Sequence, residues 1–155
     1  MAFSFGGEFE VRQAPDAVYG FLTDPQRFAP LLPDFQSLSV QDATHFTVKI
    51  NVGISHIRGV ADVKMELSEA DRPKRAQYRG QGSIAAGTVS MTAGFDLSAT
   101  GAGTRVAWRG EAQVFGRIIS MAGGLLEPLA KKNIQKLIDA LQSALNAAHA
   151  QAGEA

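Results

Sequence analysis

Apolar and polar residues alternate along most of the first three quarters of the chain, and this two-residue period is typical of strands with one buried face. The alternation begins at Phe3 and continues to Arg12, with Phe5 and Phe9 on the apolar face. It returns in five later segments, residues 44–54, 57–67, 76–82, 89–97 and 106–114. Short turns of small and polar residues separate these segments, so neighbouring strands should pair antiparallel.

Two short helices are predicted after the first strand, and one long helix at the end of the chain. Pro15 and Pro25 each suit the first turn of a helix. From Ala130 to Leu145, apolar residues recur at three- and four-residue steps opposite a polar face, which predicts a long amphipathic helix. Pro128 either kinks this helix or marks its first turn.

The order of elements is therefore one strand, two short helices, six strands and one long helix. This order predicts an α+β fold in which a curved, seven-stranded antiparallel sheet wraps around the C-terminal helix. We expect a single domain over residues 1–155, with its core in residues 3–145. The small and polar residues 147–155 are expected to form a frayed tail.

Composition excludes several classes of protein. The chain has 155 residues, and its 15 basic and 15 acidic residues balance, which argues against nucleic-acid binding. It has no cysteine, and this excludes disulfides, thiolate metal sites and a cysteine nucleophile. We find no secretory signal and no run of about 20 apolar residues that would span a bilayer. We therefore expect a soluble, cytoplasmic protein.

The polar residues do not form a recognisable catalytic or metal-binding motif. The histidines have no partner at helical ligand spacing: His45, His56 and His149. The carboxylates of Glu8, Glu10, Asp62 and Glu66 fall on the outward face of their strands by alternation. Two-carboxylate catalysis needs both groups inside one site. The sequence thus predicts no catalytic pair, no metal and no cofactor.

The inward-facing positions favour a cavity. Many of them are small: Gly59, Ala61, Gly80, Gly82, Ala93, Gly110 and Ala112. Small side chains cannot fill the space beneath a strongly curved sheet unless the helix packs very close. Methionines, which line adaptable apolar sites well, lie among them. We therefore expect a cavity that holds a small apolar ligand.

Several local motifs follow one another in a fixed order along residues 3–145. They are Phe5-Gly6-Gly7-Glu8-Phe9, Val18 with Phe21-Leu22-Thr23-Asp24-Pro25, Leu31-Leu32-Pro33, Gly53 with Ile57-Arg58-Gly59, Arg79-Gly80-Gln81-Gly82, Gly103-Thr104-Arg105-Val106 with Trp108, and Gly116 before the final helix. In this order they resemble the CoxG family, which is named for carbon monoxide dehydrogenase. That family belongs to the START-like, or SRPBCC, superfamily, whose fold is called a helix-grip.

The resemblance implies a hydrophobic cavity between the sheet and the long helix. It also implies a non-enzymatic accessory role beside a molybdenum hydroxylase of the carbon monoxide dehydrogenase type. Some family members continue into a hydrophobic C-terminal tail, whereas this chain ends in small and polar residues, so we expect no tail anchor. Peripheral contact with the inner face of the membrane is the remaining route to a bilayer.

Three functions fit these observations. The first is a binding protein that carries a quinone or other lipid-like molecule, or that recruits the hydroxylase to the membrane. The second is an enzyme resembling START-like cyclases and dehydratases, in which Tyr78 would be the inward titratable group. The third is a chaperone-like interaction module with a filled core.

The site residues follow from the alternation and from the helical stripe. The expected cavity is lined by Phe28, Leu32, Val48, Met65, Tyr78, Met91, Phe95, Trp108, Leu125, Leu126, Leu129 and Ile134. Alternate connections of an antiparallel sheet share one end, and the apolar one is the expected portal: Ile54, His56, Ile84, Phe115, Ile118, Ile119 and Met121. The hydroxyl of Tyr78 and the indole N–H of Trp108 are expected to orient a polar group of the ligand.

Overall fold

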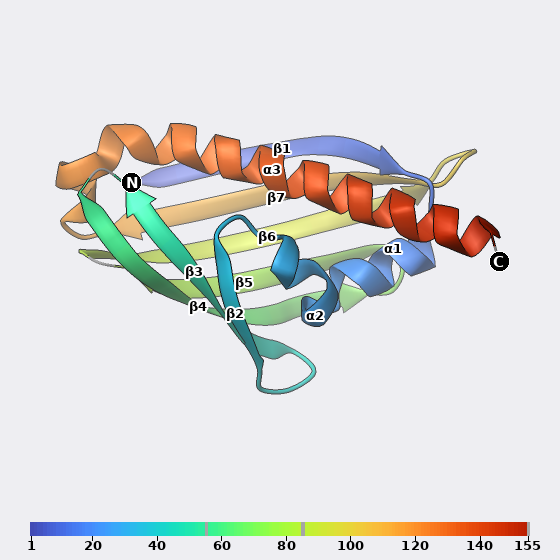
Figure 1. The fold of residues 1–155 in the computed structure, drawn as a ribbon, viewed down its shortest axis with the longest axis horizontal. Helices are drawn as coiled ribbons and strands as arrows, with labels where there is room; N and C mark the ends of the chain where they lie inside the picture. The colour runs from blue at the N-terminus through green and yellow to red at the C-terminus, as the bar shows by residue number, and fades with distance from the viewer. Residues whose placement is uncertain (55, 85, 155) are drawn as a thin grey trace.

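A computed structural model describes residues 1–54, 56–84 and 86–154, with side chains as far as residue 147. The predicted seven-stranded antiparallel sheet is confirmed, in the order β1-β7-β6-β5-β4-β3-β2 (Figure 1). Its strands are β1 (Ala2–Val11), β2 (Phe35–Val40), β3 (His45–Ile54), β4 (Ile57–Asp71), β5 (Arg75–Ile84), β6 (Gly87–Ala99) and β7 (Thr104–Phe115).

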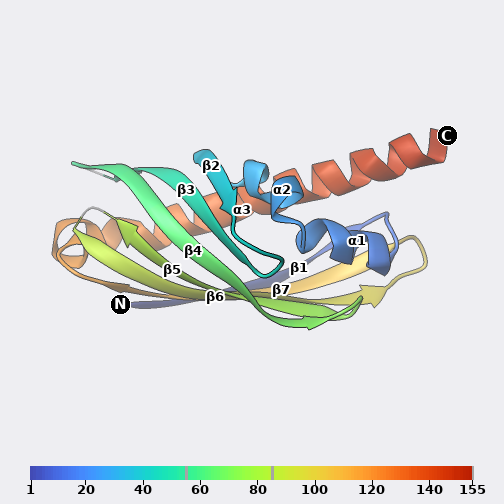
Figure 2. The same ribbon diagram turned by 90° about the horizontal axis from the view of Figure 1, so that it is seen from below.

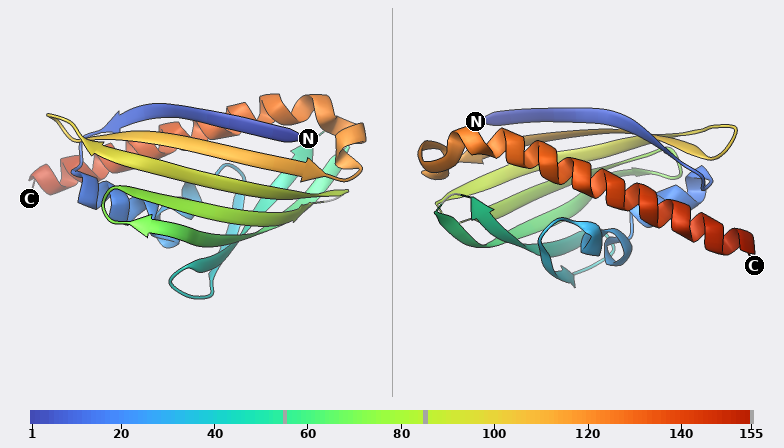
Figure 3. Two further views of the ribbon diagram at one scale, coloured as in Figure 1. Left: turned by 180° about the vertical axis from the view of Figure 1, so that it is seen from behind. Right: turned by 45° about the horizontal axis from the view of Figure 1, so that its top comes forward.

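The helices all lie on the concave side of the curved sheet (Figure 2). Between β1 and β2 come α1 (Pro15–Leu22), α2 (Pro25–Phe28) and a 3-10 turn, η1 (Ala29–Leu31). The prolines stand in the first turns, as predicted, and the carboxylate of Asp24 caps α2 by accepting from the Gln26 N–H at 3.1 Å. The convex face of the sheet is uncovered (Figure 3, left).

The long helix α3 (Ile118–Glu154) begins well before the expected stripe and crosses the sheet diagonally (Figure 3, right). Its backbone departs from helical geometry at Ala122 (φ −146°, ψ 17°), and Pro128 lies inside it. The prediction that Pro128 marks the first turn is therefore wrong. Gly116 (φ +111°) reverses the chain from β7 into α3, because a Cβ there would lie 2.6 Å from the Ala86 carbonyl oxygen.

The core consists of three hydrophobic clusters, each at a different border of the concave face. The first joins α1, the C-terminal half of α3 and the sheet through Val18, Phe21, Phe95, Val106, Leu141 and Leu145, among others. The second lies beneath α2 and η1, around Ala29, Phe46, Val48 and Tyr78. The third lies where the hairpins meet the start of α3, around Ile57, Val114, Ile118 and Ala122.

Strand register follows the predicted alternation. Tyr78 pairs with Ala93, and Phe95 pairs with Trp108, so these side chains share the inner face. On the outer face, the carboxylate of Glu10 lies 3.2 Å from the Arg105 guanidinium. The outward placement predicted for this acidic residue is thus confirmed.

We expect Leu141→Ala to destabilise the fold by about 2–5 kcal/mol, because Leu141 is buried where α3 grips the sheet. Denaturant unfolding would measure the loss. Ser143→Ala is the matched control, since Ser143 is exposed on the same part of α3. An unfolding free energy unchanged in Leu141→Ala would mean that the C-terminal half of α3 does not hold the sheet.

Candidate ligand-binding site

A row of paired residues crosses the middle of the concave face: Tyr78, Ala93, Gly110 and Phe5, one from each of β5, β6, β7 and β1. Only the ends of this row carry large side chains. Ala93 is exposed and Gly110 is half-buried, although both lie on the face that α3 crosses. A residue beneath a helix reaches solvent only if space remains between them. The centre of the sheet is therefore the floor of an open groove.

The next row adds flexible side chains to this floor. It runs through Met65, Gly80, Met91 and Ala112 on β4 to β7. A Cβ on Gly80 would lie 2.5 Å from Sδ of Met65 and 3.0 Å from Cγ of Met91, so both methionines lean over the glycine. Both are half-buried. Methionine adapts its shape at little cost, so this side of the floor can adjust to a ligand.

The core clusters close the groove at both ends. Trp108 and Leu137 pack against the first cluster, whereas Leu126 packs against the third cluster, which contains Val114. The part of α3 between these contacts, residues 129–134, must therefore lie over the two central rows. This segment is the roof of the groove.

The predicted cavity residues divide between walls, floor and roof. Four form the side wall in the second cluster: Phe28, Leu32, Val48 and Tyr78. Phe95 and Trp108 belong to the first cluster or pack on it, and Leu126 packs on the third. Met65, Met91, Leu129 and Ile134 are half-buried around the open centre. Leu125, in contrast, is 52% exposed.

The hydroxyl of Tyr78 does not face the groove as a free group. It donates a buried hydrogen bond of 2.8 Å to the Leu22 carbonyl oxygen at the end of α1. Burial also raises the pKa of this hydroxyl above its ordinary value. The expectation that it orients a ligand is therefore wrong, since its proton joins α1 to the sheet. A Cβ on Gly7 would lie 3.1 Å from the Trp108 ring, so this glycine makes room for the indole.

The predicted portal residues do lie together at one end of the sheet. The Ile118 N–H donates to the Ala86 carbonyl oxygen at 2.8 Å, and Ile54 and Ile84 pack in the same cluster. Within this end, however, Ile118 is 0% exposed and is therefore core, not a portal residue. Ile119 also packs against the third cluster.

Other side chains at this end are open to solvent. Phe115 is 52% exposed and Met121 is 54% exposed, and His56 is exposed in the β3–β4 hairpin. Ser55 and Ala85, in the two hairpins, lie outside the described residues. The side chain of His149 also lies outside them.

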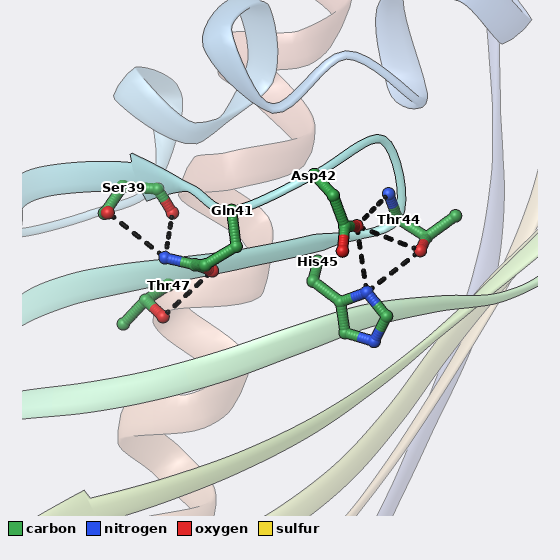
Figure 4. Close-up of polar contacts among 6 residues, drawn as sticks. All are labelled: Ser39, Gln41, Asp42, Thr44, His45 and Thr47. Atoms are coloured by element: carbon green, nitrogen blue, oxygen red, sulfur yellow. Dashed lines mark hydrogen bonds and ion pairs between the residues drawn. The ribbon is translucent and has the colours of Figure 1, made fainter.

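A polar cluster organises the opposite end, in the β2–β3 turn (Figure 4). The Asp42 carboxylate accepts from the Thr44 N–H at 2.8 Å and lies 2.9 Å from Nδ1 of His45. These contacts, the Thr44 hydrogen bond first, lower the pKa of Asp42 to about 2. A surface pocket of about 380 Å³ lies between this turn and α1–α2, lined partly by Asp24, Asp42 and Arg72. The hydrogen bonds of the turn are all local and exposed.

Two other classes of site find no support in the described part of the chain. No group of three histidine or acidic side chains is placed to hold a metal ion there. No helix among those residues has the length and apolar character that a bilayer span requires.

The sequence and the fold both match known proteins. The model of the carbon monoxide dehydrogenase family CoxG matches residues 7–146. Among curated proteins, none matches the chain.

Solved structures share the fold at low sequence identity. A conserved protein from Geobacillus kaustophilus has a TM-score of 0.81 at 19% identity, covering 92% of this chain and 95% of that one. The Zhui aromatase/cyclase from Streptomyces has a TM-score of 0.70 at 14% identity, covering 94% of both chains. The di-domain ARO/CYC StfQ of the steffimycin biosynthetic pathway has a TM-score of 0.69 at 12% identity, covering 97% of this chain and 52% of its own.

The open floor makes a specific prediction about two alanines on adjacent rows of the same face. Ala93→Leu should change the free energy of unfolding by less than about 1 kcal/mol, because its side chain enters the groove. Ala76→Leu should cost about 1–3 kcal/mol, because Ala76 is 0% exposed within the first cluster. Denaturant unfolding of both variants measures the contrast. Equal losses would mean that no groove lies above Ala93.

Proposed function

Since the chain belongs to the CoxG family of carbon monoxide dehydrogenase, we propose that it is a non-enzymatic binding protein working beside a molybdenum hydroxylase of that type. The observation that carries the binding role is the exposure of Ala93 at the centre of the concave face. A filled, chaperone-like module would bury this position beneath α3. The groove would instead hold a hydrophobic ligand, which the protein carries to or from the hydroxylase.

The groove walls support a flat or chain-like apolar ligand, such as a quinone or another lipid-like molecule. Alanine and glycine leave the floor low, and the methionines beside it can move aside. Phe28 and Trp108 contribute aromatic surface at two borders. Aromatic and apolar walls with few polar groups are the usual lining of small-molecule sites.

An enzymatic role is the second candidate, because aromatase/cyclases share this fold. The geometry supports it less well. Tyr78, the inward titratable residue expected to serve it, donates its proton to the Leu22 carbonyl oxygen. A general acid needs that proton within reach of the substrate. Turnover of a polyketide-like substrate that is lost in Tyr78→Phe, with the fold intact, would favour the enzyme.

Entry of the ligand is best supported at the hairpin end. Exposed apolar side chains gather there on neighbouring segments, and they include Phe115, Met121 and Leu125. Residues 53–60, 83–88 and 113–126 contain no acidic residue, while Arg58 and Arg117 contribute positive charge. An apolar surface flanked by cations suits an anionic bilayer. We infer that this end meets the membrane from which the ligand comes.

Native mass spectrometry of the protein purified from its own host should detect a bound hydrophobic molecule. Extraction and fragmentation would then show whether it is a quinone or another lipid. Ala93→Leu should lower the occupied fraction, because the leucine side chain fills the groove. The matched control is Ala107→Leu, on β7 but on the outer face. An empty groove, or one filled by a polar molecule, would contradict the proposal.

The double variant Phe115→Ser, Met121→Ser should weaken cosedimentation with vesicles of phosphatidylglycerol and phosphatidylcholine. Its thermal midpoint should stay close to that of the wild type, because both side chains are more than half exposed. Val40→Ser is the control, since Val40 is 45% exposed beside the β2–β3 turn. Vesicle binding that survives the double substitution would place membrane contact elsewhere. Ile119→Asp is a poorer probe, because Ile119 packs against the third cluster.

A further inference from the structure

The inward face of α3 carries one polar residue over the open groove. Asn133 follows Leu126 by seven positions and precedes Leu137 by four, so the three side chains share one face of the helix. Asn133 is half-buried, whereas its neighbours Lys132 and Gln135 are exposed. Polar side chains are expected on the outer face of an amphipathic helix, so this position departs from the pattern.

The place of Asn133 along the helix sets it above the floor. Leu137 packs on the first cluster and Leu126 on the third, and Asn133 lies between them. The strand positions between these clusters are the rows of Ala93 and Met91. The amide therefore lies on the roof of the groove, opposite the part of the sheet with the smallest side chains.

Other amides of α3 have partners in the protein. Gln142 donates from Nε2 to the Glu10 carbonyl oxygen at 3.0 Å, and Oδ1 of Asn146 accepts from the Arg12 N–H at 3.0 Å. Both bonds join the helix to β1 or to the residue after it. Among the described residues, no side-chain hydrogen bond involves Asn133. An amide on an apolar face is unfavourable unless it is hydrogen-bonded, so its presence there points to an outside partner.

We propose that Asn133 recognises an oxygen substituent on the hydrophobic ligand, and so selects carbonyl- or hydroxyl-bearing molecules over plain hydrocarbons. An amide suits this task because Nδ2 donates to a carbonyl oxygen and Oδ1 accepts from a hydroxyl. The same residue can therefore hold a ligand whose carbonyl is reduced to a hydroxyl. This inference rests on the proposed function, and it adds the chemical class of the ligand and the residue that recognises it.

A matched pair of probes isolates the hydrogen bond. 2-Acetylnaphthalene and 2-ethylnaphthalene have nearly the same shape, and only the first carries a carbonyl oxygen. Their dissociation constants are measured by equilibrium dialysis with wild type and with Asn133→Leu. The ratio of the two constants cancels differences in apolar burial. We expect the variant to reduce the preference for the ketone by about two- to tenfold, the range of one net hydrogen bond.

Two further variants make the result specific. Ser143→Leu adds the same side chain at an exposed position of α3 and should leave the preference unchanged. Asn133→Ala should reproduce the loss with a smaller side chain, so that steric filling by leucine is separated from loss of the amide. Asn133→Leu should also keep or raise the thermal midpoint, because it removes an unpaired polar group from an apolar face.

The outcomes separate this inference from the function on which it rests. If both probes bind and the preference falls in both Asn133 variants, the amide recognises the oxygen. If both probes bind with the same preference in all variants, the role of Asn133 is overturned while the groove remains a binding site. If neither probe binds to the wild type, the proposed function fails, and the role of Asn133 fails with it.

Discussion

The structure depends on how one straight helix covers a curved sheet. A curved surface and a straight rod meet at both ends, and large side chains must fill the middle if the core is to close. Here the ends are filled by the clusters around Leu141 and Ile118. The middle carries Ala93 and Gly110, which are too small to reach α3. The groove is the space that this mismatch leaves.

The polar contacts hold the rim of the groove and leave its interior apolar. The Tyr78 hydroxyl ties α1 to the sheet through the Leu22 carbonyl, and Arg72 donates to the Asp16 carboxylate at 2.8 Å from the other side of α1. At the far side of α3, Gln142 bonds to the backbone of β1. Bonds of this kind fix the walls, while the methionines between them stay adaptable. A rigid rim with a soft floor suits a carrier that must accept and release a bulky ligand.

The two ends of the molecule differ in the surface that they present. The β2–β3 turn is organised by charged and hydroxyl groups around Asp42. At the hairpin end, Phe115 and Met121 project from a cluster whose own centre, Ile118, is sealed. The exposed residues there can change without loss of the core, whereas the buried ones cannot. This division separates the surface proposed for docking from the residues that support it.

The alternation of strands and the stripe of α3 were enough to determine the fold, its register and the side of the sheet that faces the helices, because both periods report directly which residues are buried. They also placed the small residues of the floor inward. Burial of Ile118, the bond from Tyr78 to Leu22 and the break at Ala122 depend on contacts between segments far apart in sequence. No local period carries such contacts. The position of Asn133 likewise emerged only when the tertiary structure set it between two packed clusters, over a floor that has no side chain to meet it.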